Sequence, residues 1–282
     1  MGLKLMYITN RPEIATLAQY AGVDRLFVDM EYIGKKSRQL GRDTVLSHHT
    51  LDDVKAIRKI ADKSQLMVRV NPIHGEVDEI GTSKDEIDAV IAAGADIIML
   101  PFFKTADEVK EFIEIISGRV KTMLLFETPE SVDIVDEILG IDGIDEVFIG
   151  LNDLSLGYGE KFLFEPLADG TVEMLCKKFR AAGKPYGFGG IASLGRGVLA
   201  SEYIITEHYR LGSSAAILSR SFYNANTTNH ISEIGRIFIN GIAEIRGFEF
   251  KCAEHLSKGD MQFFENNHDE LVKKVRKISE NM

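Results

Sequence analysis

The chain has 282 residues, 45% of them hydrophobic, and a formal net charge of −10 at pH 7. This length can bury one large or two modest cores, and the lack of any run of about 18 apolar residues excludes a membrane-spanning helix. The acidic balance argues against a nucleic-acid partner, because phosphate neutralisation needs a basic surface. The chain begins without a secretory signal pattern, and Cys176 and Cys252 form no spaced motif, so we expect a cytoplasmic protein with reduced thiols.

Strand and helix patterns alternate along the chain. Short apolar runs predict strands at Leu3–Ile8, Arg25–Asp29, Leu66–Val70, Asp96–Leu100, Thr122–Phe126, Glu146–Gly150, Pro185–Phe188 and Tyr209–Gly212. Helical spacing predicts helices at Pro12–Tyr20, Leu51–Ala61, Lys84–Ala93, Ala106–Ile116, Ser131–Leu139, Thr171–Ala182 and Val198–Glu207. Thr50 with Asp53, and Thr105 with Glu108, are typical of capping boxes.

This alternation predicts an α/β fold, a (β/α)₈ TIM barrel, which needs around 250 residues. The alternative is an open, doubly wound sheet. Such a sheet usually has fewer strands and a glycine-rich phosphate turn after the first, which Thr9-Asn10-Arg11-Pro12 does not provide. The eighth strand has the weakest pattern of the series.

Beyond Tyr223 the spacing is helical only, with a break at Ser257–Asp260. We therefore predict a barrel over residues 1–222 and a C-terminal helical extension over residues 223–282. The apolar stripe of this extension comprises Ile231, Ile234, Phe238, Ile242 and Ile245, followed by Leu271, Val275 and Ile278. Such a stripe needs a surface to bury against, which is either its own barrel or that of a neighbouring subunit in a homo-oligomer.

Two carboxylates, Glu127 and Asp153, follow neighbouring strands of the predicted barrel. Parallel neighbours lie about 4.8 Å apart, so both side chains reach the same rim. Two carboxylates facing each other repel unless they share a proton or bind a cation, and Mg²⁺ or Mn²⁺ suits such a pair. The alternative is that Asp153 only caps a helix while Glu127 pairs with Arg69.

Further polar residues fall at the ends of the other predicted strands. They are Asp29, Glu31, Arg69, Asn71, Pro101, Asn152, Gly189, Gly190, Ser213 and Ser214. Arg69 interrupts an apolar strand, which is costly unless it meets an anion. That anion is either a substrate carboxylate or an internal partner, Glu31 or Glu127.

Several of these segments together carry a family resemblance. They are Val28-Asp29-Met30-Glu31, Val68-Arg69-Val70, Gly94 through Pro101, Thr105 through Glu108, Leu124 through Pro129, Gly143-Ile144-Asp145 and Phe148 through Ser155. This ordered series, over roughly residues 3 to 220, closely resembles the HpcH/HpaI aldolase/citrate lyase family. The resemblance implies a (β/α)₈ barrel whose last helices are commonly exchanged between subunits.

The resemblance also implies a chemistry. A divalent metal is held by the residues matching Glu127 and Asp153, and a 2-keto acid chelates it. The arginine matching Arg69 lies against the keto oxygen and steadies a pyruvate-type enolate, and backbone amides from Gly150 to Asn152 hold the substrate carboxylate. The implied reaction is aldol cleavage or addition of 2-keto-4-hydroxy acids, with an aldehyde, which we expect to be derived from a sugar, as the other partner.

The sequence departs from the family pattern at two positions. Tyr32 stands where the hydroxy-acid aldolases carry an acid/base histidine, and Leu125 where they often carry glutamine. Tyrosine titrates near 10 and is a poor base at neutral pH. The substitutes we consider are His48, His49, His74 and a metal-bound water. The candidate catalytic residues are Arg69, Glu31, Asp29 and His74; the candidate substrate-binding residues are Arg69, Gly150, Leu151, Asn152 and Pro101; the candidate metal ligands are Glu127 and Asp153.

The segment from Tyr32 to Thr50 is long for a strand-to-helix connection, which favours a functional lid. Its cations Lys35, Lys36, Arg38 and Arg42 either bind a second anionic group or form a solvated face. Phe188-Gly189-Gly190-Ile191 likewise predicts either a phosphate site or a tight turn.

Three functions remain open at this point. The first is a metal-dependent carbon–carbon lyase acting on a 2-keto acid. The second is an enzyme like citrate lyase or malyl-CoA lyase that acts on an acyl thioester. The third is a catalytically inert barrel that binds metal and ligand, which the absence of the strand-two histidine keeps open.

Overall fold

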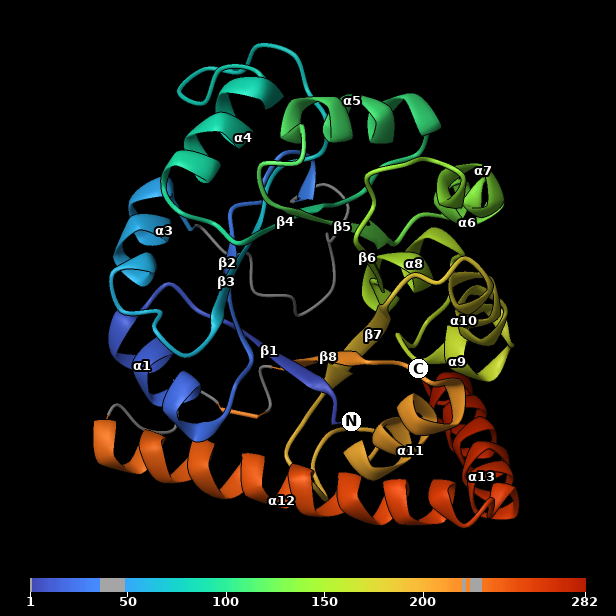
Figure 1. Cartoon of the computed structure of the whole chain (residues 1–282). Coiled ribbons are helices and arrows are strands. Elements are labelled where there is room, and N and C mark those ends of the chain that lie inside the picture. The colour runs from blue at the N-terminus through green and yellow to red at the C-terminus, as the bar shows by residue number, and fades with distance from the viewer. Residues whose placement is uncertain (1, 36–48, 220–221, 224–229) are drawn as a thin grey trace.

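The structure is a computed structural model, and it describes residues 2–35, 49–219, 222–223 and 230–282. Eight parallel strands form a closed barrel in chain order, with β8 paired to β1 (Figure 1). The strands are β1 Lys4–Ile8, β2 Arg25–Asp29, β3 Gln65–Arg69, β4 Ile97–Leu100, β5 Lys121–Phe126, β6 Glu146–Ile149, β7 Tyr186–Ile191 and β8 Ala215–Leu218. The predicted (β/α)₈ barrel is therefore confirmed.

Helices surround the barrel and connect its strands (Figure 1). They are α1 Pro12–Ala21, α3 Leu51–Arg58, α4 Ser83–Ala92, α5 Ala106–Ile116, α6 Pro129–Asp133, α7 Val135–Leu139, α8 Leu151–Gly157, α9 Glu165–Ala168, α10 Thr171–Ala181, α11 Ser201–Leu211, α12 Ile231–Ser257 and α13 Met261–Glu280. Both predicted capping boxes are present, at Thr50 with Asp53 and at Thr105 with Glu108. The single helix predicted over Ser131–Leu139 is instead two short ones, separated at Ile134.

The prediction of the eighth strand was wrong. Tyr209, Arg210 and Leu211 form the last turn of α11, which Gly212 ends in the left-handed conformation at φ 71°. The strand follows as Ala215–Leu218, an apolar segment too short to stand out in the sequence. Ser213 and Ser214 consequently precede β8 and lie at the amino-terminal end of the barrel, away from the predicted active-site rim.

Side chains from alternating strand positions fill the barrel interior. The hydrophobic cluster inside the barrel consists of Met6, Phe27, Met67, Ile97, Met99, Met123, Leu125, Phe148 and Ala215. Towards the amino-terminal ends of the strands, the buried Arg25 forms two hydrogen bonds with Glu146, of 2.8 and 2.6 Å. The interior is therefore packed, and the opposite end, where the strands finish, is left for chemistry.

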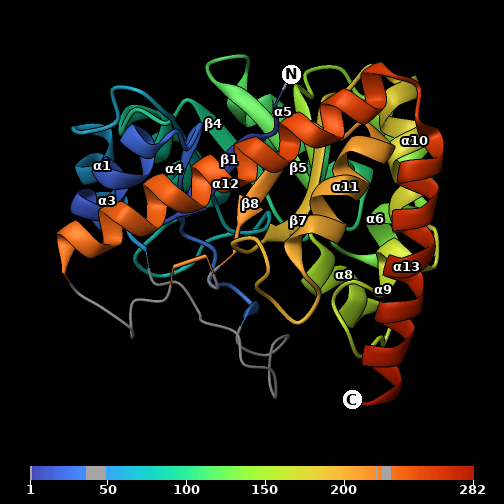
Figure 2. The ribbon, with the colours of Figure 1, turned by 90° about the horizontal axis from the view of Figure 1, so that it is seen from below.

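Helix α12 crosses the outside of the barrel against α1 and α11, and α13 packs against α9 and α11 (Figures 1 and 2). The predicted stripe is largely buried within this chain, since Ile234, Phe238, Ile242 and Ile245 are at most 3% exposed. The boundary near residue 222 and an exchange of these helices between subunits remain predictions. No helix within the described ranges is both long and apolar enough to cross a bilayer.

Candidate active site

A buried ion-pair cluster lies at the carboxyl-terminal ends of β2 and β3. Asp29 and Arg69 are register partners on the two strands. The Arg69 guanidinium donates two hydrogen bonds of 2.8 Å to the two carboxylate oxygens of Asp29, and its Cζ lies 5.7 Å from the centre of the Phe27 ring. A bidentate pair fixes both the position and the plane of the guanidinium.

Glu31 and Lys35 complete this cluster. Glu31 Oε2 lies 3.3 Å from Arg69 Nε and 3.2 Å from Lys35 Nζ, and Lys35 Nζ donates to Asp29 Oδ2 at 2.9 Å. Asp29, at the end of β2, and Glu31 and Lys35, on the loop that follows, are all buried. Of the anions predicted for Arg69, the structure therefore provides Glu31, together with Asp29.

The charges in the cluster stabilise one another. Burial raises the pKa of the Asp29 carboxyl, but the charges and hydrogen bonds of Arg69 and Lys35 outweigh it and hold that pKa below its ordinary range. Burial lowers the pKa of Arg69, while Asp29, Glu31 and, more weakly, Glu127 raise it above the ordinary value. Asp29 is therefore ionised at neutral pH and too weak a base to remove a proton from a hydroxyl group.

The sequence did not indicate the role of Lys35, which was grouped with the cations of a possible lid. Lys35 is four residues from Glu31, but that spacing favours an ion pair only on a helix, and Glu31 lies outside any helix. Lys36, Arg38, Arg42 and His48 lie outside the described residues.

Glu127 directly follows β5 and is 2% exposed. Its Oε1 accepts a 3.0 Å hydrogen bond from the backbone N–H of Phe102, a residue held at φ 50°. A Cβ atom on Gly150 would come within 2.7 Å of Glu127 Oε2, so the carboxylate lies against the start of α8. Asp153 is in the first turn of the same helix. The two predicted metal ligands thus belong to the same part of the rim.

The predicted substrate-binding residues lie on either side of Glu127. Pro101 follows β4 and leads into the Phe102 turn. The Gly150 N–H is engaged, because it donates to the Phe126 carbonyl at 2.9 Å. Leu151 and Asn152 are the first two residues of α8, where backbone N–H groups have no partner within the helix.

A second polar network supports the segment after β2. Asn71 Oδ1 accepts hydrogen bonds of 2.9 and 3.0 Å from the backbone N–H groups of Tyr32 and Ile33. The Asn71 side chain in turn donates to Glu86 of α4 at 2.8 Å, and His74 Nε2 lies 3.3 Å from the same carboxylate. Burial raises the pKa of Glu86, and these partners oppose that shift. Sequence reasoning missed Glu86 because it lies within a helix rather than at a strand end.

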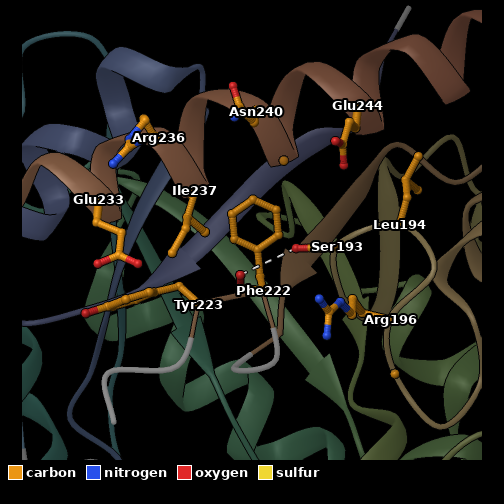
Figure 3. A pocket seen from close by; sticks show the side chains of 12 residues that line it. Ser193, Leu194, Arg196, Phe222, Tyr223, Glu233, Arg236, Ile237, Asn240 and Glu244 are labelled. Carbon is orange, nitrogen blue, oxygen red and sulfur yellow. Dashed lines mark hydrogen bonds between the residues drawn. The ribbon is translucent and has the colours of Figure 1, made fainter. Parts of the chain in front are cut away.

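A pocket of about 940 Å³ lies elsewhere, between α12 and the segments after β7 and β8 (Figure 3). Arg196, Arg236, Glu233 and Glu244 line it, and Ser193 donates a 3.4 Å hydrogen bond to the Phe222 carbonyl at its wall. None of the predicted site residues lines it. Gly189 and Gly190, predicted after β7, lie within that strand, next to a register irregularity.

Comparison with known proteins agrees with this arrangement. The family model for HpcH/HpaI aldolase/citrate lyase matches residues 4–188, which include β1 to β6 and the ion-pair cluster. The chain belongs to this family. One relative is the 2-keto-3-deoxy-L-rhamnonate aldolase of Escherichia coli O17:K52:H18 (strain UMN026 / ExPEC), which is 28% identical over 211 residues, 64% of this chain and 71% of that protein.

Solved structures show the same fold. The HpcH/HpaI aldolase from Desulfitobacterium hafniense DCB-2 has a TM-score of 0.60 at 18% identity, covering 77% of this chain and 86% of its own. An HpcH/HpaI aldolase/citrate lyase family protein from Burkholderia cenocepacia J2315 also has a TM-score of 0.60, at 16% identity, covering 83% and 95%. This chain is therefore a member of a family of aldolases and lyases, which act on small molecules.

Two histidines lie near the ion-pair cluster within the described part of this HpcH/HpaI family member. His49 Nδ1 is 3.0 Å from the backbone nitrogen of Asp29. His74 has both ring nitrogens engaged, Nδ1 with the Gly75 carbonyl at 2.7 Å and Nε2 with Glu86. The Tyr32 side chain is 45% exposed, and burial, with Glu86 and Glu79, raises its pKa, which disfavours Tyr32 as a base.

Proposed function

We propose that this protein is a divalent metal-dependent carbon–carbon lyase that cleaves or forms 2-keto-4-hydroxy acids through a pyruvate-type enolate. The observation that supports this most is the fixed Arg69 guanidinium, held by Asp29 and Glu31 at the rim that also carries Glu127 and Asp153. The relative named 2-keto-3-deoxy-L-rhamnonate aldolase supports the same class of substrate, with a sugar-derived aldehyde as the second product.

The donor set at the rim fits a hard cation. The described residues contain no group of three or more His, Cys, Asp or Glu side chains placed to hold a metal. Mg²⁺ needs no such group, because it binds one or two carboxylates and keeps several waters. Glu127 and Asp153 would hold Mg²⁺ or Mn²⁺. The metal, when bound, would act as a Lewis acid that stabilises the enolate.

The chain's own residues provide the rest of the electrostatic stabilisation. Arg69 is already oriented by Asp29, so its charge needs no reorganisation when negative charge develops on the keto oxygen. The N–H groups of Leu151 and Asn152 would bind the substrate carboxylate, with Pro101 opposite them. Because Asp29 stays ionised, we assign it to positioning Arg69 and Lys35. We assign the same positioning role to the buried Glu31, because its carboxylate lies 3.3 Å from Arg69 and 3.2 Å from Lys35.

The proposal is tested by proton exchange. The protein is incubated with pyruvate and Mg²⁺ or Mn²⁺ in D₂O, and loss of the pyruvate methyl signal is followed by NMR. We expect metal-dependent exchange, which Glu127→Gln abolishes together with metal binding. Glu137→Gln is the matched control, because Glu137 is on the exposed face of α7 of the same strand–helix unit. Full exchange in Glu127→Gln would contradict the assigned site.

Replacing Arg69 by lysine tests the proposed role of Arg69 in stabilising the enolate. Lysine keeps the positive charge but cannot make the bidentate pair with Asp29. We expect Arg69→Lys to lower the exchange rate by at least about tenfold while metal binding is retained. An unchanged exchange rate would remove Arg69 from the mechanism.

Tyr32 at the position of the family's histidine supports a second candidate, a barrel that binds metal and ligand without turnover. Metal-dependent pyruvate binding without exchange would favour it, and activity on acyl thioesters without exchange would favour a citrate lyase-like enzyme. We also propose a homo-oligomer, and a cytoplasmic location that agrees with the two free, buried cysteines Cys176 and Cys252.

A further inference from the structure

His49 is held in one defined tautomer. It lies directly before α3 and is half-buried. The backbone N–H of Asp29 points at its Nδ1 over 3.0 Å. A backbone N–H is always a donor, so Nδ1 must present its lone pair, and the ring proton of a neutral imidazole is then on Nε2.

The surroundings favour this neutral form. Burial lowers the pKa of His49, the negative charges of Asp29 and Asp53 oppose that shift, and the positive charges of Lys35 and Arg69 support it. An imidazolium would also place a second N–H against the Asp29 amide, donor against donor.

A neutral imidazole fixed in this way can do only one kind of chemistry. A general base needs a lone pair directed at the substrate, and the one lone pair of this ring is engaged by the Asp29 amide. The proton on Nε2 remains available as a hydrogen-bond donor, on the other side of the ring from that amide. A neutral histidine can stabilise developing negative charge in this manner without transferring its proton.

We propose that His49 is a neutral hydrogen-bond donor, through Nε2–H, to a substrate oxygen that gains negative charge when the carbon–carbon bond breaks. The ligand class is an oxyanion, either the enolate oxygen of the keto-acid half or the C4 oxygen of the aldehyde half. His49 neither gains nor loses a proton in the cycle. The inference rests on the proposed lyase function.

His74 does not offer this chemistry. Its Nδ1 faces a carbonyl and therefore carries a proton, and its Nε2 faces the Glu86 carboxylate. Neither nitrogen is left to meet a substrate. We therefore assign His74, predicted as catalytic from the sequence, to positioning Glu86 and, through it, Asn71.

The tautomer is tested in the resting protein by NMR of ¹⁵N-labelled histidine side chains, with His49 assigned from the signal lost in His49→Gln. We expect an unprotonated Nδ1 and a protonated Nε2 throughout about pH 6 to 8. A proton on Nδ1, or titration of the ring within that range, would overturn the proposal. This measurement does not depend on any activity.

The role is tested by two substitutions. His49→Leu removes the donor, and we expect about a 100-fold loss of rate. His49→Gln places an N–H near the position of Nε2 and should recover most of that loss with an unchanged pH–rate profile. His255→Leu is the matched control, since His255 lies near the end of α12 and pairs with Asp260. Thermal unfolding of each variant verifies folding, and the His49→Gln comparison stands if His49→Leu does not fold.

Pyruvate exchange and aldol cleavage, measured separately, identify the substrate oxygen that accepts the hydrogen bond from His49. Slower pyruvate exchange in His49→Leu assigns the donor to the enolate oxygen, whereas slower aldol cleavage alone assigns it to the C4 oxygen. If both rates match the wild type, the proposal is wrong while the lyase function stands. If the wild type performs neither reaction, the lyase function fails, and with it the assigned role of His49.

Discussion

Asp29→Asn tests whether the ion-pair cluster contributes as much to the free energy of unfolding as its burial implies. The substitution keeps the shape of the side chain but removes the charge that faces both Arg69 and Lys35. The new amide N–H₂ group must face one of these cations, which places donor against donor. The Asp29 and Lys35 side chains are 3% and 6% exposed and that of Arg69 is 13% exposed, so solvent screening is weak.

The expected magnitude follows from the remaining contacts. Removing one partner of a buried ion pair costs about 3–5 kcal/mol. Glu31 still lies 3.3 Å from Arg69 and 3.2 Å from Lys35, so we expect the lower end, about 3 kcal/mol of the free energy of unfolding. At about 2–4 °C per kcal/mol for a chain of this size, the melting temperature should fall by about 6–12 °C.

Differential scanning calorimetry at pH 7 measures this change, and Asp107→Asn provides the control. Asp107 is 92% exposed and pairs with Lys110 on the surface of α5, a kind of pair worth about 0–1 kcal/mol. The pKa of Asp29 is lowered in the folded state, so its stabilisation is present above the unfolded pKa of about 3.9 and is lost as pH falls through the lower folded pKa. A melting temperature for Asp29→Asn within the range of the control would refute the reasoning.

Three further predictions concern other parts of the chain. Ser117→Gly should raise the free energy of unfolding by about 0.5–1 kcal/mol in urea denaturation, because Ser117 ends α5 at φ 50° and is exposed; a loss of stability would contradict this. The hydrogen bond to Glu207 raises the pKa of His268, so this contact holds α13 below about pH 6.5 and weakens as pH rises through the folded pKa. The protection factors of the α13 amides, which compare each exchange rate with the intrinsic rate at the same pH, should be lower at pH 8 than at pH 6, and this difference should vanish in His268→Gln. Asn71→Ala should remove the side-chain donor to Glu86 and the acceptor for the backbone N–H groups of Tyr32 and Ile33. We expect it to lower kcat more than metal affinity, and equal losses in both would count against a positioning role.

Much of the fold was predictable because the spacing of the apolar residues and the residues that begin or end helices indicate the same element boundaries. β2 begins and ends where its apolar run does, and the capping box at Thr105 starts α5 as predicted. The failure at Tyr209–Gly212 has a physical cause. The end of α11 is apolar enough to resemble a buried strand, whereas the real strand, Ala215–Leu218, has only four residues.

The candidate site was predictable where residues follow strand ends. Asp29 and Arg69 could be placed at one rim from the strand pattern alone, and the register of β2 and β3 pairs them. Contacts made by the loop after β2 could not be predicted, because no periodicity specifies which loop side chains turn inward. The positions of Lys35 and His49 are therefore known only from the structure.

The Arg25–Glu146 pair at the closed end of the barrel has a consequence for how the chain folds. Its two residues are on β2 and β6, four strands apart around a ring of eight, so the pair bridges opposite walls. A half-barrel that stops before β6 would leave the Arg25 guanidinium in an apolar interior without a counter-ion. The two halves of the barrel should therefore be unable to fold separately. A growing chain should reach its native packing only after residue 146 has been synthesised.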